Sequence, residues 1–208
     1  AICPSDAGES LQDFETPGLD GPNFPLLCGN TQSGILGIDN SYVYLGWLFD
    51  KVENDDDPIT IANFFSSDPP QITGPEQLGE AVLDLVPILL GGTPEEIAQK
   101  ADSDLPVPAD CECGNGNGDS IYRLREGIER FLVTNINDPA ASASAQSEVF
   151  IMFDQVAVDP AGYNHVPGGS NVLYLDGHVE FIRYIQGGSP APVNQGVAEL
   201  VGLIAFGA

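Results

Sequence analysis

Apolar residues recur at helical spacing in two stretches of the chain, and a third helix start lies between them. The first stretch, residues 75–90, begins at Pro75-Glu76 and predicts a helix. A short second helix is expected from Pro94, with Thr93 as its N-cap. The other stretch, residues 120–133, predicts a helix in which Glu126 and Arg130 form an i, i+4 ion pair. The apolar faces are Leu78, Ala81, Val82, Leu85 and Ile88 in the first stretch, and Leu124, Ile128 and Phe131 in the other.

Short β-rich runs follow at residues 149–153, 171–175 and 178–184. The last two flank Asp176-Gly177, for which we expect a two-residue type I′ turn with positive φ at both positions. Residues 42–49 are aromatic and apolar, which fits either a buried strand or the start of a helix. Helices followed by an antiparallel sheet indicate the α+β class.

The two ends of the chain differ from its middle. Residues 1–40 are rich in Gly, Pro and Asp and predict an irregular arm of a single domain over 1–186. Residues 187–208 read as a linker and an apolar tail, which either folds back onto its own core or docks on a neighbouring subunit, as a strand or as a helix in a groove. Docking is the preferred interpretation, and it assigns the assembly contact to Leu200, Val201, Leu203, Ile204 and Phe206.

Charge changes this picture more than any other property. The 208 residues include 31 acidic and only 6 basic side chains, a formal net charge of −25. Nucleic acid is excluded as a partner because phosphate binding needs clustered Lys and Arg, and an anionic membrane surface is disfavoured for the same reason. Repulsion among so many carboxylates opposes compaction, and calcium bound by oxygen ligands would relieve it. The alternative is an acidic, solvated surface without metal.

The cysteines and the ends of the sequence indicate an extracellular protein. The chain has no apolar run of about 18 residues, so no membrane span is expected. It starts at Ala1 without a signal peptide, which we interpret as the product of processing. Its even number of cysteines predicts disulfides of open connectivity, although a bond within Cys-Glu-Cys would close a strained ring. The cysteines are Cys3, Cys28, Cys111 and Cys113. Zinc is disfavoured by their spacing and by the presence of only two histidines.

Several blocks of the sequence resemble one protein family. They are Ile2-Cys3-Pro4-Ser5-Asp6, residues 41–47, 122–131 and 146–154, and the stretch 164–181 that contains His165 and Asp176-Gly177. The chain is similar in these blocks to bacterial pilin-like secreted proteins, common in planctomycetes, whose C-terminal domain is named for a His, nine residues and Asp-Gly. Ten residues separate the two elements here. The resemblance implies a pilin or pseudopilin head domain that lacks the N-terminal helix, and it implies no reaction.

Two groups of oxygen side chains are candidate calcium ligands. Asn115, Asn117, Asp119 and Glu126 occupy positions one, three, five and twelve of a loop, the spacing of an EF-hand. The alternative is a Gly/Asn linker in which Asp119 or Ser120 caps a helix. The second group lies beside the hairpin, where some pseudopilins bind calcium, and comprises Glu148, Asp154, Asp159 and Asn171.

The remaining polar residues give no further metal site within one subunit and no catalytic site. The run Asp55-Asp56-Asp57 is a solvated charge cluster or, between subunits, a metal bridge. His165 and His178 are expected to make hydrogen bonds near the turn rather than to bind metal. None of the hydrolase, phosphate-loop or metalloprotease motifs is present in the sequence, so we expect no enzymatic activity.

These observations favour a structural protein that assembles with itself into an extracellular filament, tube or sheath stabilised by calcium. The alternative is a monomeric, calcium-stabilised module for adhesion or ligand binding at the cell surface, or a minor pseudopilin of a secretion system. The tail separates the first two: docking on a neighbour favours the polymer, and packing within its own subunit favours the monomer.

Overall fold

A four-stranded antiparallel sheet organises the C-terminal half of the fold, with strand order β10-β9-β8-β3. The computed structural model describes residues 42–62, 71–128, 146–157, 163, 165 and 168–205, with backbone alone at 15–16, 24–25 and 203–205. The strands are β1 (Glu15–Thr16), β2 (Phe24–Pro25), β3 (Tyr42–Val43), β4 (Pro58–Ala62), β5 (Gln71–Pro75), β6 (Leu105–Pro106), β7 (Ser120–Ile121), β8 (Phe150–Asp154), β9 (Gly169–Tyr174) and β10 (Val179–Arg183). The helices are α3 (Glu76–Gly91), α4 (Pro94–Ala101), the 3₁₀ turn η2 (Asn115–Asn117) and α6 (Gln195–Ala205), and described residues 146–148 are also helical.

The β9–β10 hairpin confirms the predicted strands but not the predicted turn. Val179 pairs with Leu173 and Arg183 with Gly169, so one face of the hairpin buries Val172 and Ile182 in the core. The Gly177 amide donates to the Tyr174 carbonyl over 2.9 Å, and Gly177 has φ +88° while Asp176 does not have positive φ. A tight turn followed by a left-handed glycine gives a three-residue loop instead of a two-residue type I′ turn.

Both helices predicted in the middle of the chain are confirmed. Helix α3 begins one residue after Pro75 and buries Leu78, Ala81 and Val82. Helix α4 has the expected N-cap: Thr93 Oγ1 accepts from the Glu96 amide, and Glu96 Oε2 accepts from the Thr93 amide over 2.8 Å. This reciprocal capping box satisfies two backbone donors that a helix start otherwise leaves free.

The helix predicted over residues 120–133 is wrong for the part that the structure describes. Ser120–Ile121 forms β7, antiparallel to β6, and Arg123 bridges to Trp47. The Leu124 amide donates to the Gly46 carbonyl over 2.9 Å, and the Leu48 amide donates to the Tyr122 carbonyl over 2.8 Å. Because distant segments use these backbone groups, they cannot form i→i−4 bonds. Residues 129–133, including Arg130 and Phe131, lie outside the described residues.

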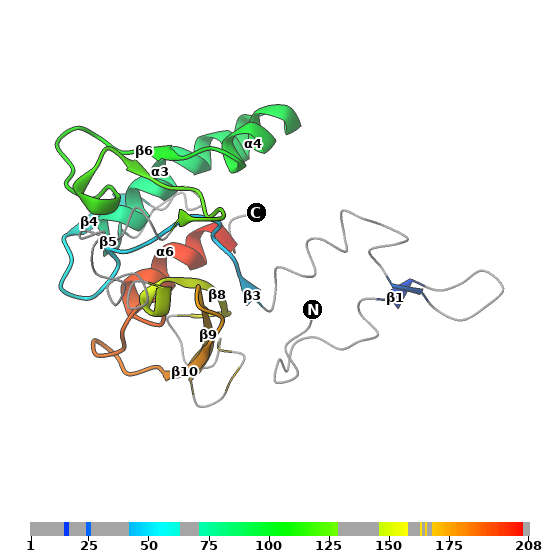
Figure 1. The fold of residues 1–208 in the computed structure, drawn as a ribbon, viewed down its shortest axis with the longest axis vertical. Helices are drawn as coiled ribbons and strands as arrows, with labels where there is room; N and C mark the ends of the chain where they lie inside the picture. The colour runs from blue at the N-terminus through cyan, green and yellow to red at the C-terminus, as the bar shows by residue number, and fades with distance from the viewer. Residues whose placement is uncertain are drawn as a thin grey trace.

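The C-terminal tail packs within its own subunit. The prediction that Leu200 and Val201 contact a neighbouring subunit is therefore wrong for these two residues. Both side chains are buried in the main core together with Val197. Helix α6 packs against β5 and α3 (Figure 1). Leu203 and Ile204 belong to α6 with undescribed side chains, and Phe206 lies outside the described residues.

Two glycines allow the close approach of α6 to β5. A Cβ on Gly74 would lie 2.5 Å from Leu200 Cδ1, and a Cβ on Gly196 would lie 2.9 Å from Pro75 Cδ. Asn194 fixes the start of α6, because its Oδ1 accepts from the Val197 amide over 2.8 Å and its Nδ2 donates to the Val52 carbonyl over 2.7 Å. The tail therefore joins the core through both packing and hydrogen bonds.

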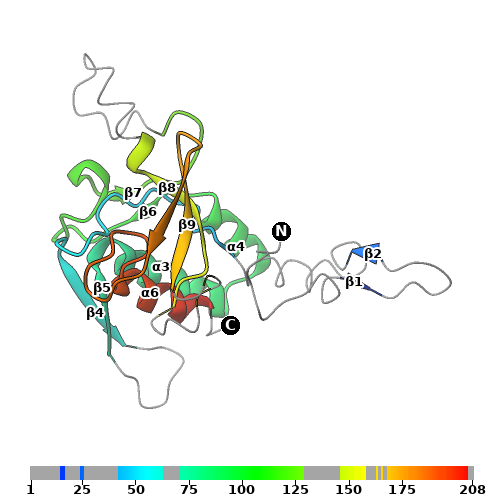
Figure 2. The ribbon, with the colours of Figure 1, turned by 90° about the horizontal axis from the view of Figure 1, so that it is seen from below.

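The molecule is a mixed α and β fold with an antiparallel sheet, compatible with the α+β class. The first two of residues 42–49 form the short strand β3 at the sheet edge, so the strand interpretation is confirmed for these two residues. Figure 2 shows the β9–β10 hairpin extending past the helices. None of the helices in the described part of the chain is long and apolar enough to cross a membrane.

Candidate functional sites

The loop expected to bind calcium like an EF-hand is held by hydrogen bonds between protein groups. Asn115 is buried, and its Nδ2 donates to the Leu48 carbonyl over 3.1 Å and to Asp50 Oδ1 over 2.6 Å. Its Oδ1 accepts from the Tyr122 amide over 2.7 Å. Two of these bonds join the loop to residues 48–50 and the third joins it to the residue after β7, so this side chain positions the loop.

The other three residues of that loop have separate surroundings. Asn117 Oδ1 accepts from Lys51 Nζ over 2.5 Å, and Asp119 Oδ1 accepts from Ser120 Oγ over 3.0 Å. Glu126 is exposed in a turn. Asn115, Asn117 and Asp119 each bond to different protein groups rather than facing a common point, so the EF-hand spacing does not produce an EF-hand arrangement here.

Gln77 connects three segments of this region, and no motif or spacing in the sequence identified it as a site residue. Its side chain is fully buried at the start of α3. Its Oε1 accepts from the amides of Asp50 and Lys51, each over 3.0 Å. Its Nε2 donates to Asp50 Oδ1 and to the Cys113 carbonyl, each over 2.8 Å. One side chain thus connects α3, residues 50–51 and the Cys-Glu-Cys loop.

A pocket of about 160 Å³, here called the Lys51 pocket, lies beside this network. Its walls include four carboxylates, from Asp56, Asp57, Glu76 and Glu112, together with Asn117 and Lys51. Lys51 Nζ also donates to the Glu112 carbonyl. The run Asp55-Asp56-Asp57 therefore contributes two side chains to a concave, oxygen-rich site. Its donors are of the type that calcium prefers.

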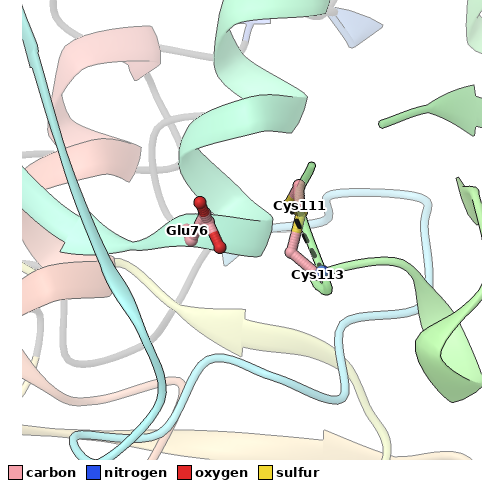
Figure 3. A group of neighbouring side chains, drawn as sticks. All are labelled: Glu76, Cys111 and Cys113. Carbon is pink, nitrogen blue, oxygen red and sulfur yellow. Dashed lines mark hydrogen bonds between the residues drawn. A yellow bond between two sulfur atoms is a disulfide. The ribbon is translucent and has the colours of Figure 1, made fainter. Parts of the chain in front are cut away.

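The cysteines beside this pocket form a disulfide. Cys111 is bonded to Cys113, and oxygen of Glu76 lies with the two sulfur atoms in a group spanning less than 4.8 Å (Figure 3). A disulfide sulfur is not a thiolate ligand, so in this state the group offers a metal only the carboxylate. Cys3 and Cys28 lie outside the described residues, and their pairing stays a prediction.

The second predicted group is brought together in part. Asp154 is buried, and its Oδ2 accepts from the Asn171 amide over 2.9 Å and from Asn171 Nδ2 over 2.7 Å. His165 Nε2 lies 2.8 Å from the same oxygen. These neighbours stabilise the carboxylate without a metal. Asp159 lies outside the described residues, and Glu148 lines a different hollow.

That hollow, here called the Glu148 groove, has a volume of about 500 Å³. Its carboxylates are Asp50, Glu53, Glu148 and Glu180, and its aromatic walls are Phe49, Phe150 and Tyr174. Burial, followed by the charges of Glu180 and Glu53, raises the pKa of Tyr174. The groove therefore combines negative potential with apolar surface, which suits a cation.

His178 makes the hydrogen bonds near the turn that were expected of both histidines, whereas His165 does not. His178 Nδ1 lies 2.6 Å from Asp176 Oδ1, and hydrogen bonds from the His178 backbone and side chain lower the pKa of that carboxyl. His165 contacts Asp154 at the far end of β9 instead of the turn itself.

Comparisons with known proteins do not identify a family for this chain. The chain matches no protein-family model, and no significant match is found among curated proteins or among solved structures. The resemblance to pilin-like proteins therefore stays a prediction from sequence motifs, and the function has to be argued from surfaces and pockets.

Proposed function

We propose that this protein is a secreted structural subunit, with a pilin-like head, that assembles with itself into an extracellular filament, tube or sheath. The observation that supports this most directly is the exposed apolar surface of β10 and the residues after it. Val179 is 60% exposed, Phe181 50% and Ile185 59%. Such a surface on a chain of net charge −25 supports contact with another molecule.

The position of β10 indicates how a second copy would bind. No strand in the described part of the chain pairs with the outer edge of β10, and β3 forms the opposite edge of the same sheet. If β10 of one copy pairs with β3 of the next, the sheet continues from subunit to subunit. Such a contact joins two different surfaces, so it generates open polymers unless the rotation closes a ring.

Calcium has a defined part in this proposal. Packing copies of so acidic a chain brings many carboxylates together, and this repulsion opposes assembly. The Lys51 pocket and the Glu148 groove are each lined by four acidic residues, and in the described part of the chain Lys51 is the only basic residue that lines either. Calcium bound at these sites, within or between subunits, would lower that repulsion.

Electron microscopy of the purified protein tests this function. We expect ordered filaments or tubes in the presence of calcium and dispersed particles after a chelator is added, because chelation restores the repulsion among carboxylates. Polymers that survive thorough chelation would refute the calcium mechanism. Dispersed particles in both conditions would refute self-assembly.

Adding negative charge to the apolar β10 surface tests the contact itself. The double variant Val179→Glu, Ile185→Glu should fold, since both side chains are exposed, but should not polymerise. Each single variant, Val179→Glu and Ile185→Glu, has Leu90→Glu as its matched control, because Leu90 is equally exposed at the end of α3. If the double variant and the control polymerise equally well, the contact lies elsewhere while the structural function stands.

The burial of the tail favours a second candidate. A chain that uses Val197, Leu200 and Val201 in its own core is complete without a neighbour. The candidate is a monomeric, calcium-stabilised module for adhesion or ligand binding at the cell surface. Particles that bind calcium but remain dispersed at every concentration would support it over the polymer.

A further inference from the structure

An apolar pocket lies between residues 44–49, α3 and α4, and it shares only Phe49 with the lining of the Glu148 groove. Its volume is about 190 Å³, and its walls include Trp47, Leu78, Ala81, Leu85, Ile88 and Ile97. An apolar cavity of about 150 Å³ stays free of water and is large enough to bind benzene. This pocket therefore has room for one aromatic ring or a short alkyl chain.

The outer wall of the pocket is loosely packed. Helix α4 contributes Ile97, Lys100 and Ala101 to the lining, yet none of its residues is buried. Tyr44 and Leu89 also line the pocket, and they remain 50% and 48% exposed. Apolar surface thus continues from the inside of the pocket to solvent, so a ligand has a path of entry.

Two basic side chains lie at or next to this pocket, although the chain as a whole is strongly negative. Lys100 lines it and forms an ion pair with Asp84. The guanidinium carbon of Arg123 lies 5.9 Å from the ring centre of Tyr44 and 5.4 Å from that of Trp47, and both rings line the pocket. Two of the six basic residues of the chain therefore flank this one apolar cavity.

We propose that the pocket binds a small amphiphile that combines an aromatic ring or short alkyl chain with a carboxylate. The apolar part would lie against Trp47, Leu85 and Ile97. The carboxylate would reach the mouth and share the Lys100 ammonium with Asp84. An uncharged or cationic amphiphile would bury the same apolar area without this attraction. Neither assembly nor calcium is required for the binding.

Trp47 makes the test direct, because it is the only tryptophan of the chain and lines the pocket. The full chain is titrated with octanoate, octanol and octylammonium while tryptophan emission is recorded. Octanoate should give a saturable change, and octylammonium should bind about tenfold or more weakly, the equivalent of about 1.4 kcal/mol. Absence of a saturable change with octanoate, or equal affinity for octylammonium, would overturn the proposal.

Variants separate the apolar and charged contributions. Ala81→Leu adds a side chain inside the pocket and should abolish the response, whereas Leu90→Ala, outside the lining, should leave it unchanged. If Ala81→Leu does not fold, Ile97→Phe on the exposed helix α4 serves the same purpose. Lys100→Gln should weaken octanoate binding to the level of octanol without changing octanol binding.

Two results from these variants would count against the proposal. A response to octanoate that survives in the filled pocket would show that the ligand binds elsewhere. Octanoate binding that weakens as the protein concentration rises would show that a second copy, and not a small ligand, occupies the pocket.

Discussion

Leu200→Ala should lower the free energy of unfolding by about 2–5 kcal/mol. Leu200 has no exposed surface and lies in the core cluster between α6 and β5. Its Cδ1 would be only 2.5 Å from a Cβ on Gly74, so the leucine fills the space that the glycine leaves. Removing three carbon atoms there creates a cavity beside a backbone that cannot easily collapse into it.

Chemical denaturation of the monomer in urea measures this effect. Leu90→Ala is the matched control, because it makes the same change in a helix at a side chain that is 61% exposed. The control should change stability by less than about 0.5 kcal/mol. Equal, small effects for both variants would mean that the tail does not pack into its own core, and would restore the tail as the contact between subunits.

This result also bears on the function. In a subunit whose tail is internal, Leu200→Ala weakens the fold but leaves the β10 surface intact. Polymers of the folded variant should therefore look like those of the original protein. If the variant folds but no longer polymerises, the tail takes part in the contact, and the β10 proposal is incomplete.

Local sequence signals predicted the elements that depend on local interactions. Thr93 and Glu96 form their capping box within four residues, and Gly177 supplies the one left-handed position of its loop. The predicted β8, β9 and β10 follow the same principle, since their apolar residues and the Asp-Gly signal are contiguous in the chain. Tertiary contacts are not needed to recognise any of them.

The segment after Ser120 shows where such signals fail. Its apolar residues fit helical spacing, yet the amide of Leu124 and the carbonyl of Tyr122 bond to residues 46–48. Ile121 is fully buried opposite Leu105, which a strand pairing achieves and a solvated helix would not. Helical propensity is weak enough for these long-range bonds to override it.

The same distinction between local signals and long-range contacts applies to the candidate sites. Asp154 and Asn171 were expected together, and the pairing of neighbouring strands places them in hydrogen-bonding contact. The EF-hand spacing of Asn115 and Asn117 predicted a common centre, but long-range partners turn the two side chains elsewhere. A spacing along the chain specifies ligand geometry only when the loop has no stronger partners, and here Leu48, Asp50 and Lys51 provide them.

Gln77→Leu should be among the most destabilising substitutions at a polar side chain, at about 3 kcal/mol or more. Leucine matches the size of glutamine but makes none of its four hydrogen bonds. The amides of Asp50 and Lys51 would lose their acceptor, and the Cys113 carbonyl would lose its donor. Each buried group left without a partner costs about 1–3 kcal/mol, reduced where water can reach it.

The control is Gln71→Leu, the same substitution at an exposed residue of β5. It should be nearly neutral in urea denaturation, so the difference between the two variants measures the network and not the change of residue type. Hydrogen exchange locates the effect: the amides of Asp50 and Lys51 should lose protection in Gln77→Leu. Unchanged protection there, together with a small loss of stability, would mean that Gln77 does not connect α3 to the Cys-Glu-Cys loop.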